Sequence, residues 1–195
     1  MITRLRALFA RKTPTMEPVE LNEATREVMA LSRSELQRSR TTIRMELAED
    51  LPLVMGDRVQ LQQVIMNLLR NASEAMSEVD DRPREIVIRT ARDDDDRVVV
   101  SVQDAGSGFE PHSAEKMFDA FYTTKQHGMG IGLSVSRSII ESHRGRLWAV
   151  PNEGPGVTFS FSIPRSLEEE GVEAHEHGDS ARSLVAPDVP ALGSV

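Results

Sequence analysis

Apolar residues recur at spacings of three and four along three stretches of the chain, which predicts three amphipathic helices. The first is expected to run from an N-cap at Asn22 to about Arg38. Its predicted core residues are Ala24, Val28, Leu31 and Leu36. The longest helix is expected over about residues 58–77, capped by Asp57, and the third over Leu133–Ser142.

Alternation of apolar and polar residues marks the predicted strands. They are a short strand at Val19 and Leu21, Thr41–Leu47, an extended piece at Val54, the hairpin Glu85–Arg92 and Arg97–Gln103, and the closing pair Arg146–Val150 and Val157–Ile163. Ile43, Met45 and Leu47 are expected to face one way and to be half-buried. The order of elements predicts an α+β fold, a two-layer α/β sandwich in which helices cover one face of a mixed, mostly antiparallel sheet.

The two ends of the chain differ from this pattern. Residues 1–12 carry a helical apolar stripe with arginines between, made of Ile2, Leu5, Leu8 and Phe9. A helix this short cannot bury its stripe alone, so we interpret it as the end of a longer bundle helix or a partner-binding segment. Pro14 and Pro18 mark a linker. Residues 166–195 are acidic and then rich in Ala, Pro, Ser and Gly, which predicts a disordered tail.

Composition restricts the partners. The chain has 195 residues, a net charge of −8 and no cysteine. The acidic excess argues against binding to nucleic acid or to an anionic membrane, and a chain without cysteine has no disulfide framework or thiolate zinc site. No apolar run has the length of a membrane span. We therefore expect a soluble, cytoplasmic protein.

The most informative stretch is Asp119–Gly145. About 25 residues before Gly132 have no clear period, which is typical of a functional loop within a compact domain. Gly128, Gly130 and Gly132 stand at alternate positions just before a helical run. Glycines let backbone N–H groups approach phosphate oxygens, and the helix adds its positive end. We interpret the stretch as a lid that closes over a nucleotide triphosphate.

Two further groups have suitable chemistry. Asn67 and Asn71 lie four residues apart at the edge of the apolar face of the longest helix, where amide oxygens suit Mg²⁺. For a single Asn, a solvated helix flank is the more common explanation. Asp104 ends a buried strand and is followed by Gly106 and Gly108, so its carboxylate can accept a hydrogen bond from the exocyclic amine of adenine. Taken alone, this motif also fits an ordinary turn.

Taken together, the motifs resemble the catalytic and ATP-binding domain of bacterial sensor histidine kinases, in the gyrase/Hsp90/histidine kinase/MutL ATPase superfamily. LQQVIMNLLRNASEAM is similar to the N box, VQDAGSGF to the G1 box, MFDAFYTTK to the F box and GMGIGLSVSRSIIESHRG to the G2 box. All four occur in family order. The resemblance covers residues 17–165 and implies a Bergerat-type ATP-binding fold.

The resemblance also implies roles for individual residues. Asn71 should coordinate the Mg²⁺ that bridges the phosphates, supported by Asn67. Hydrolysing relatives carry a glutamate at the Asn67 position; an amide is a poor base, which suits a kinase. Asp104 should bind the adenine amine, with Thr158 near it through water. The remaining implied ATP-binding residues are Gly106 and Gly108 at the pocket wall, Lys125, Gly128, Gly130 and Gly132 at the phosphates, and Leu133. Lys125 and Asn67 are the implied catalytic residues, and Phe118, Phe121 and Tyr122 should anchor the lid by packing.

One departure concerns the phosphoacceptor. The five histidines are His112, His127, His143, His175 and His177, and none lies in an N-terminal helix of the type that carries the acceptor. Residues 1–16 resemble the end of the dimerisation hairpin and a linker, so we expect a truncated kinase that does not autophosphorylate alone. Its partners would be a histidine-bearing dimerisation domain, in cis or in trans, and indirectly a response regulator. His143 is expected to be structural.

Two alternatives remain open at this point. A stand-alone ATPase of the same superfamily would turn over ATP without a histidine substrate, and Asn67 argues against it. A regulatory binding module, like the anti-sigma serine kinases, would instead form a complex with a sigma-like or response-regulator protein.

Overall fold

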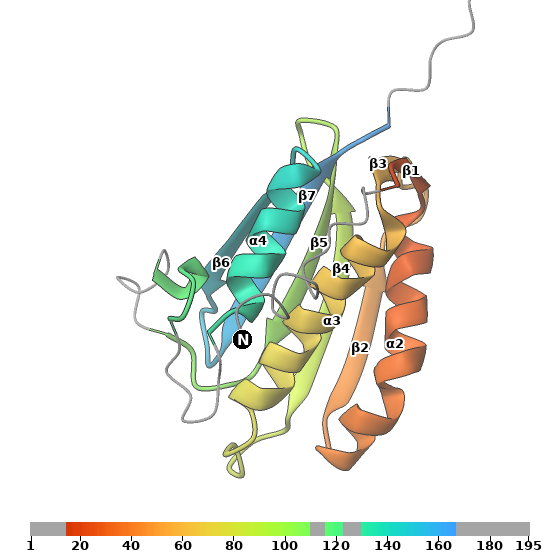
Figure 1. The fold of residues 1–195 in the computed structure, drawn as a ribbon. Helices are drawn as coiled ribbons and strands as arrows, with labels where there is room; N and C mark the ends of the chain where they lie inside the picture. Colours follow the sequence, from red (N-terminus) through yellow and green to blue (C-terminus); the bar gives the residue numbers. More distant parts are fainter. Residues whose placement is uncertain (1–14, 110–115, 123–129, 167–195) are drawn as a thin grey trace, which may run out of the picture.

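Three α-helices lie on one face of a five-stranded sheet in the computed structural model, which describes residues 15–109, 116–122 and 130–166 (Figure 1). In chain order the elements are β1 (Glu17–Val19), α2 (Leu21–Arg38), β2 (Thr42–Leu47), β3 (Val54–Gly56), α3 (Arg58–Ala75), β4 (Glu85–Arg92), β5 (Arg97–Asp104), the 3₁₀ turn η2 (Lys116–Phe118), α4 (Gly132–Ser142), β6 (Arg146–Pro151) and β7 (Val157–Pro164). The predicted fold class and order of elements are confirmed. In the described part of the chain, no helix combines the length and apolar character needed to cross a membrane.

The main sheet has the strand order β2-β4-β5-β7-β6. Its β2–β4 pair is parallel and its other pairs are antiparallel, while β1 and β3 form a separate two-stranded sheet. Alternate residues of β4, β5 and β7 face the helices and are buried, among them Ile88, Val100 and Phe161. Figure 1 shows α3 between α2 and α4, so this helix contacts both neighbours and the sheet.

The first helix differs from the prediction in two ways. Its N-cap is Glu20, whose side chain accepts from the Glu23 N–H; Asn22 lies inside the helix. The buried Asn22 amide donates to the Ala48 carbonyl oxygen at 2.8 Å and accepts from Thr90 Oγ1 at 2.7 Å, so it joins α2 to the sheet. Because both partners are distant in the sequence, they hold the Asn22 side chain inside the protein, and it does not cap the helix.

Leu31, an expected core residue of α2, is exposed. Leu31 is 73% exposed, because the buried stripe of α2 passes through Val28 and Ser32 and Leu31 lies beside it. The Ser32 hydroxyl donates to the Val28 carbonyl oxygen, which allows a polar residue at that buried position. Met45 is 49% exposed because β2 is an edge strand, whose outer side has no neighbouring strand.

The central helix α3 follows its prediction closely. Asp57 is its N-cap and accepts from the Gln60 N–H at 3.1 Å, although the helix ends at Ala75, two residues early. Its buried face includes Leu61, Ile65 and Leu68. On the exposed side, Arg58 binds Glu27 of α2 at 2.9 Å, and this hydrogen bond lowers the pKa of the Glu27 carboxyl.

His143 connects the end of α4 to the start of α3. The ring is 3% exposed; Nε2 lies 2.9 Å from the Asp57 backbone nitrogen and Nδ1 lies 2.7 Å from the Ile139 carbonyl oxygen. Because a carbonyl only accepts, Nδ1 carries the proton and Nε2 accepts from the Asp57 N–H. This is the neutral imidazole in a structural role, as predicted.

Replacing His143 with Phe should lower the free energy of unfolding by about 1–3 kcal/mol, because a ring of similar volume leaves the Asp57 N–H without its acceptor. Urea unfolding followed by circular dichroism measures the change. Glu141→Gln, on the exposed side of the same helical turn, serves as the control and should shift stability by less than about 0.5 kcal/mol. Equal stability of His143→Phe and wild type would show that the imidazole is not a structural link.

Candidate functional site

The predicted site residues divide into those that the structure describes and those that it does not. Lys125 and Gly128 lie outside the described residues. The others fall in three places: the end of β5, the rim of α3 and the start of α4. They are Asn67, Asn71, Asp104, Gly106, Gly108, Gly130, Gly132 and Leu133, together with Thr158 on β7.

Asp104 is a buried carboxylate at the end of β5, with 3% of its surface exposed. Its Oδ1 accepts from the Gly106 N–H at 2.8 Å and from the Val157 N–H at 3.3 Å. Its own carbonyl oxygen accepts from the Asn152 side-chain amide at 2.9 Å. These hydrogen bonds fix the orientation of an acceptor group inside the protein.

Glycines allow two loops to approach this carboxylate. A Cβ at Gly106 would lie 2.8 Å from the Ala75 carbonyl oxygen and 2.9 Å from Asp104 Oδ1, so only glycine fits. Gly108 has φ of 77°, in the region that favours glycine. Gly156 has φ of 96°, and a Cβ there would overlap the Asp104 carbonyl oxygen. Gly156 ends the turn Asn-Glu-Gly-Pro-Gly between β6 and β7, and nothing in that turn's sequence indicates its contact with Asp104.

Arg82 supports the same loop and was also missed. Its Nε donates to the Ala105 carbonyl oxygen and its Nη2 to the Gly106 carbonyl oxygen, each at 3.0 Å. In the sequence, Arg82 stands in a loop of mixed charge where no period marks it. Its contacts form only because the loop before β4 and the loop after β5 meet in the folded protein. The residues next to Arg82 in the sequence do not indicate this meeting.

The structure does not bring Thr158 to the Asp104 carboxylate. Thr158 pairs with Gln103 across β5 and β7, and successive side chains of a strand point to opposite faces. The Thr158 side chain is therefore on the face opposite to that of Asp104, where its hydroxyl donates to Asn152 Oδ1 at 2.7 Å. The nearest group of this strand is the Val157 N–H.

Asn67 and Asn71 lie on the rim of α3 and are partly buried. Ala75 follows at the same spacing. The three residues therefore form one stripe along α3 that spans about two helical turns, or about 12 Å. One end of the stripe contacts Gly106 through Ala75. The other end contacts α4, because a Cβ at Gly132 would lie 2.6 Å from Asn67 Oδ1. The stripe thus connects the surroundings of Asp104 to the start of α4.

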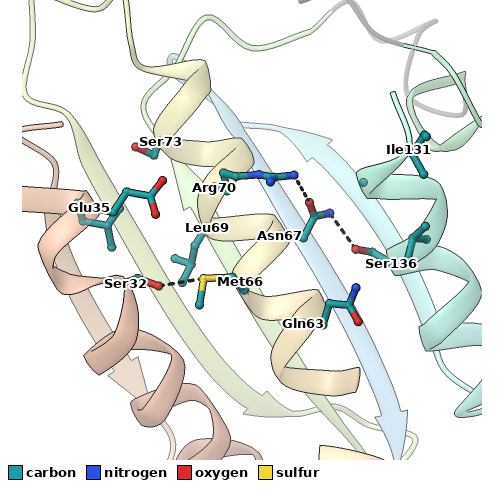
Figure 2. Close-up of a pocket in the computed structure, with 13 residues that line it drawn as sticks. Ser32, Glu35, Gln63, Met66, Asn67, Leu69, Arg70, Ser73, Ile131 and Ser136 are labelled. Atoms are coloured by element: carbon teal, nitrogen blue, oxygen red, sulfur yellow. Dashed lines mark hydrogen bonds between the residues drawn. The ribbon is translucent and has the colours of Figure 1, made fainter. Parts of the chain in front are cut away.

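Asn67 has two side-chain partners (Figure 2). Its Nδ2 donates to Ser136 Oγ at 2.9 Å, and its Oδ1 accepts from Arg70 Nη2 at 3.3 Å. Beside it, an open groove of about 420 Å³ is lined by residues of α2, α3 and α4, among them Ser32, Met66 and Val135. Among the described residues, no three His, Cys, Asp or Glu side chains converge as metal ligands.

The segment before α4 packs against the protein through its backbone. Gly130 has φ of 63°, and a Cβ there would lie 2.6 Å from the Phe121 carbonyl carbon. The Phe121 N–H donates to the Gly130 carbonyl oxygen at 2.8 Å. At the start of α4, the N-cap Ile131 provides no side-chain hydrogen bond to the first turn. Gly130 and Gly132 are therefore explained in this structure by close packing.

The aromatic residues of the F box do not all behave as expected. Phe118 is 8% exposed and meets Phe159 edge-to-face, with ring centroids 6.5 Å apart, which fits the predicted anchoring role. Phe121 is 76% exposed, so its ring does not anchor this segment. Its φ of 70° turns the chain so that the backbone contacts Gly130 while the ring faces outward. Tyr122 is partly buried.

Comparison with known proteins finds relatives of this chain. Residues 56–167 match the family described as Histidine kinase-, DNA gyrase B-, and HSP90-like ATPase. The sensor protein FixL of Bradyrhizobium diazoefficiens is 42% identical over 168 residues, which cover 86% of this chain and 33% of FixL. The chain therefore spans about a third of that relative.

Solved structures give the same result. The catalytic domain of histidine kinase ThkA is 37% identical, with a TM-score of 0.68 over 77% of this chain and 96% of that one. ThkA in complex with the response regulator TrrA is 30% identical, with a TM-score of 0.70 over 85% of this chain and 46% of the ThkA chain.

Proposed function

Because the chain belongs to the histidine kinase-, DNA gyrase B- and HSP90-like ATPase family, we propose that it binds Mg-ATP between Asp104 and α4. We further propose that it donates the γ-phosphate to a histidine on a separate phosphoacceptor domain. Its relatives are sensor histidine kinases, so it carries the ATP-binding kinase part of a two-component system. A response regulator would then receive the phosphoryl group from that histidine.

The stripe formed by Asn67, Asn71 and Ala75 is the observation that carries the proposal. Ala75, at one end, lies beside the Gly106 loop that holds the buried Asp104 carboxylate, and the amides of Asn71 and Asn67 follow about 6 Å and about 12 Å further along the helix. A carboxylate acceptor suits the amine of adenine, and amide oxygens suit a hard cation that arrives with phosphates. From Ala75 to Asn67, the groups suited to the base and then to the phosphate-bound cation therefore follow the order of base and phosphates in a nucleoside triphosphate.

Each residue has a distinct role in this proposal. Asp104 selects the base through its carboxylate, while Gly106 and Gly108 keep the pocket wall free of side chains. Asn71 holds the cation, Asn67 supports it, and Lys125 with Gly128 completes the phosphate contacts. Bound Mg-ATP supplies the transferable phosphoryl group. The protein contributes positioning and charge neutralisation, which account for most of the catalysis of phosphoryl transfer.

The nature of Asn67 distinguishes transfer from hydrolysis. A general base must accept a proton from water, and a neutral amide does so poorly. In this structure the amide nitrogen of Asn67 is committed to Ser136 and its oxygen contacts Arg70. This arrangement favours a kinase over a stand-alone ATPase.

A transfer assay tests the proposal. The whole chain should phosphorylate a separate two-helix hairpin bearing an acceptor histidine when Mg-ATP is present, because the γ-phosphate must leave toward a partner. The product should be acid-labile phosphohistidine, detected with labelled ATP. A hairpin with its histidine replaced by Gln is the control and should remain unlabelled. Intact ATP binding without transfer would refute the kinase half of the proposal.

A further inference from the structure

Ser136 stands out as a buried hydroxyl that touches the predicted metal site from another element. It lies on α4, is 2% exposed, and accepts a hydrogen bond from Asn67 Nδ2 on α3 at 2.9 Å. Figure 2 shows the two side chains facing each other across the gap between these helices. A buried hydrogen bond between two helices fixes both partners, because breaking it leaves a polar group without compensation.

The partners also determine which way the Asn67 amide points. Arg70 can only donate, so the Asn67 atom 3.3 Å from its guanidinium must be the oxygen. The nitrogen then faces Ser136, whose oxygen can accept. With the nitrogen committed to Ser136, the carbonyl oxygen, which also accepts from Arg70, is the only atom of this amide that can be a ligand to a cation. Amide orientation matters because only the oxygen can be a ligand to Mg²⁺.

The backbone of α4 confines the same amide. A Cβ at Gly132 would lie 2.6 Å from Asn67 Oδ1 and 3.1 Å from Nδ2, so the first turn of α4 packs directly on the amide plane. Ser136 follows one turn later on the same side of the helix. Gly132 therefore confines the Asn67 amide by close packing, and Ser136 holds it by a hydrogen bond.

We propose that Ser136 is a positioning residue that holds Asn67 Oδ1 toward the cation of bound Mg-ATP. This inference rests on the proposed function, which gives Asn67 a supporting role beside Asn71 at that cation. It adds that α4, which continues directly from the glycine-rich lid, sets the orientation of a group on α3. A rotation of α4 would turn the Asn67 amide and so change the affinity of the site for Mg²⁺.

The test compares Ser136→Ala with Ser138→Ala, an exposed serine of the same helix. Alanine preserves the helix, so both variants should fold. In the metal-free protein, the Asn67 side-chain amide signals in a ¹⁵N–¹H spectrum should move in Ser136→Ala and not in Ser138→Ala. The Mg²⁺ concentration for half-maximal ATP binding should rise roughly fivefold in Ser136→Ala, as expected for one lost hydrogen bond.

A double-mutant cycle separates positioning from a general structural effect. In an Asn67→Ala background, Ser136→Ala should leave the Mg²⁺ requirement unchanged, because the group that it orients is gone. An equal rise in both backgrounds, or no rise in the wild-type background, would overturn the inference while leaving ATP binding in place. A wild-type chain without Mg²⁺-dependent ATP binding would overturn the proposed function and this inference with it.

Discussion

Replacing Asp104 with Asn should weaken ATP binding about 100-fold and leave the fold intact. The carboxylate is 3% exposed and is proposed to accept a hydrogen bond from the exocyclic amine of adenine. A hydrogen bond to a buried charge contributes about 1.5–3 kcal/mol, and each 1.4 kcal/mol changes affinity about tenfold. The substitution also presents an N–H donor to another donor, so the expected loss is near the upper end of this range.

The fold should survive because Asn keeps one of the two functions of the carboxylate. Its carbonyl oxygen can still accept from the Gly106 and Val157 N–H groups, which donate to Asp104 Oδ1 in the wild-type protein. The amide nitrogen then takes the place of the other carboxylate oxygen, which is proposed to face the nucleotide. Urea unfolding should therefore shift by less than about 1 kcal/mol.

Calorimetry with two nucleotides makes the test specific. Wild type should bind ATP more tightly than inosine triphosphate, which lacks the amine, whereas Asp104→Asn should lose that preference. Asp57→Asn is the matched control, because Asn also caps helices and this residue is at the opposite end of α3 from Ala75. Equal affinity of wild type and Asp104→Asn for ATP would remove Asp104 from the adenine site.

The sequence was sufficient where local periodicity and a local motif decide the structure. The buried face of α3 and its Asp57 cap follow from spacing and capping alone, and both are present. The order of elements was also predictable, and with it the sandwich. Leu31 was misplaced because one helical step decides whether a side chain is buried, and that step cannot be read from a single segment.

The site was less predictable where partners come from distant segments. Arg82 reaches a loop 23 residues later, Ser136 reaches Asn67 across 69 residues, and Gly156 approaches Asp104 from the turn before β7. No periodic signal marks such pairs, because their contact exists only after folding. Thr158 is the opposite case, a residue that was expected near Asp104 and is not. Because side chains alternate along β7, its hydroxyl lies on the other face of the sheet and bonds to Asn152.

Replacing Asn71 with Ala should abolish the Mg²⁺ dependence of nucleotide binding. Asn71 occupies the middle of the stripe on α3, one turn from Asn67, which already contacts α4. Its amide oxygen is proposed as the protein ligand of the cation, and Ala offers no oxygen there. In EDTA, wild type and variant should bind ATP equally; with Mg²⁺, only wild type should bind more tightly.

Gln63→Ala provides the matched control for this prediction. Gln63 carries the same functional group on the same helix, but it is exposed and lies two turns before Asn71, beyond Asn67 (Figure 2). Its loss should leave both affinities unchanged, which separates the amide at position 71 from an amide elsewhere on the helix. Alanine favours helix more than Asn or Gln, so α3 should persist in both variants. If Asn71→Ala retained the full gain on adding Mg²⁺, the cation would have to be held by other groups, and the stripe would position the phosphates without binding the metal.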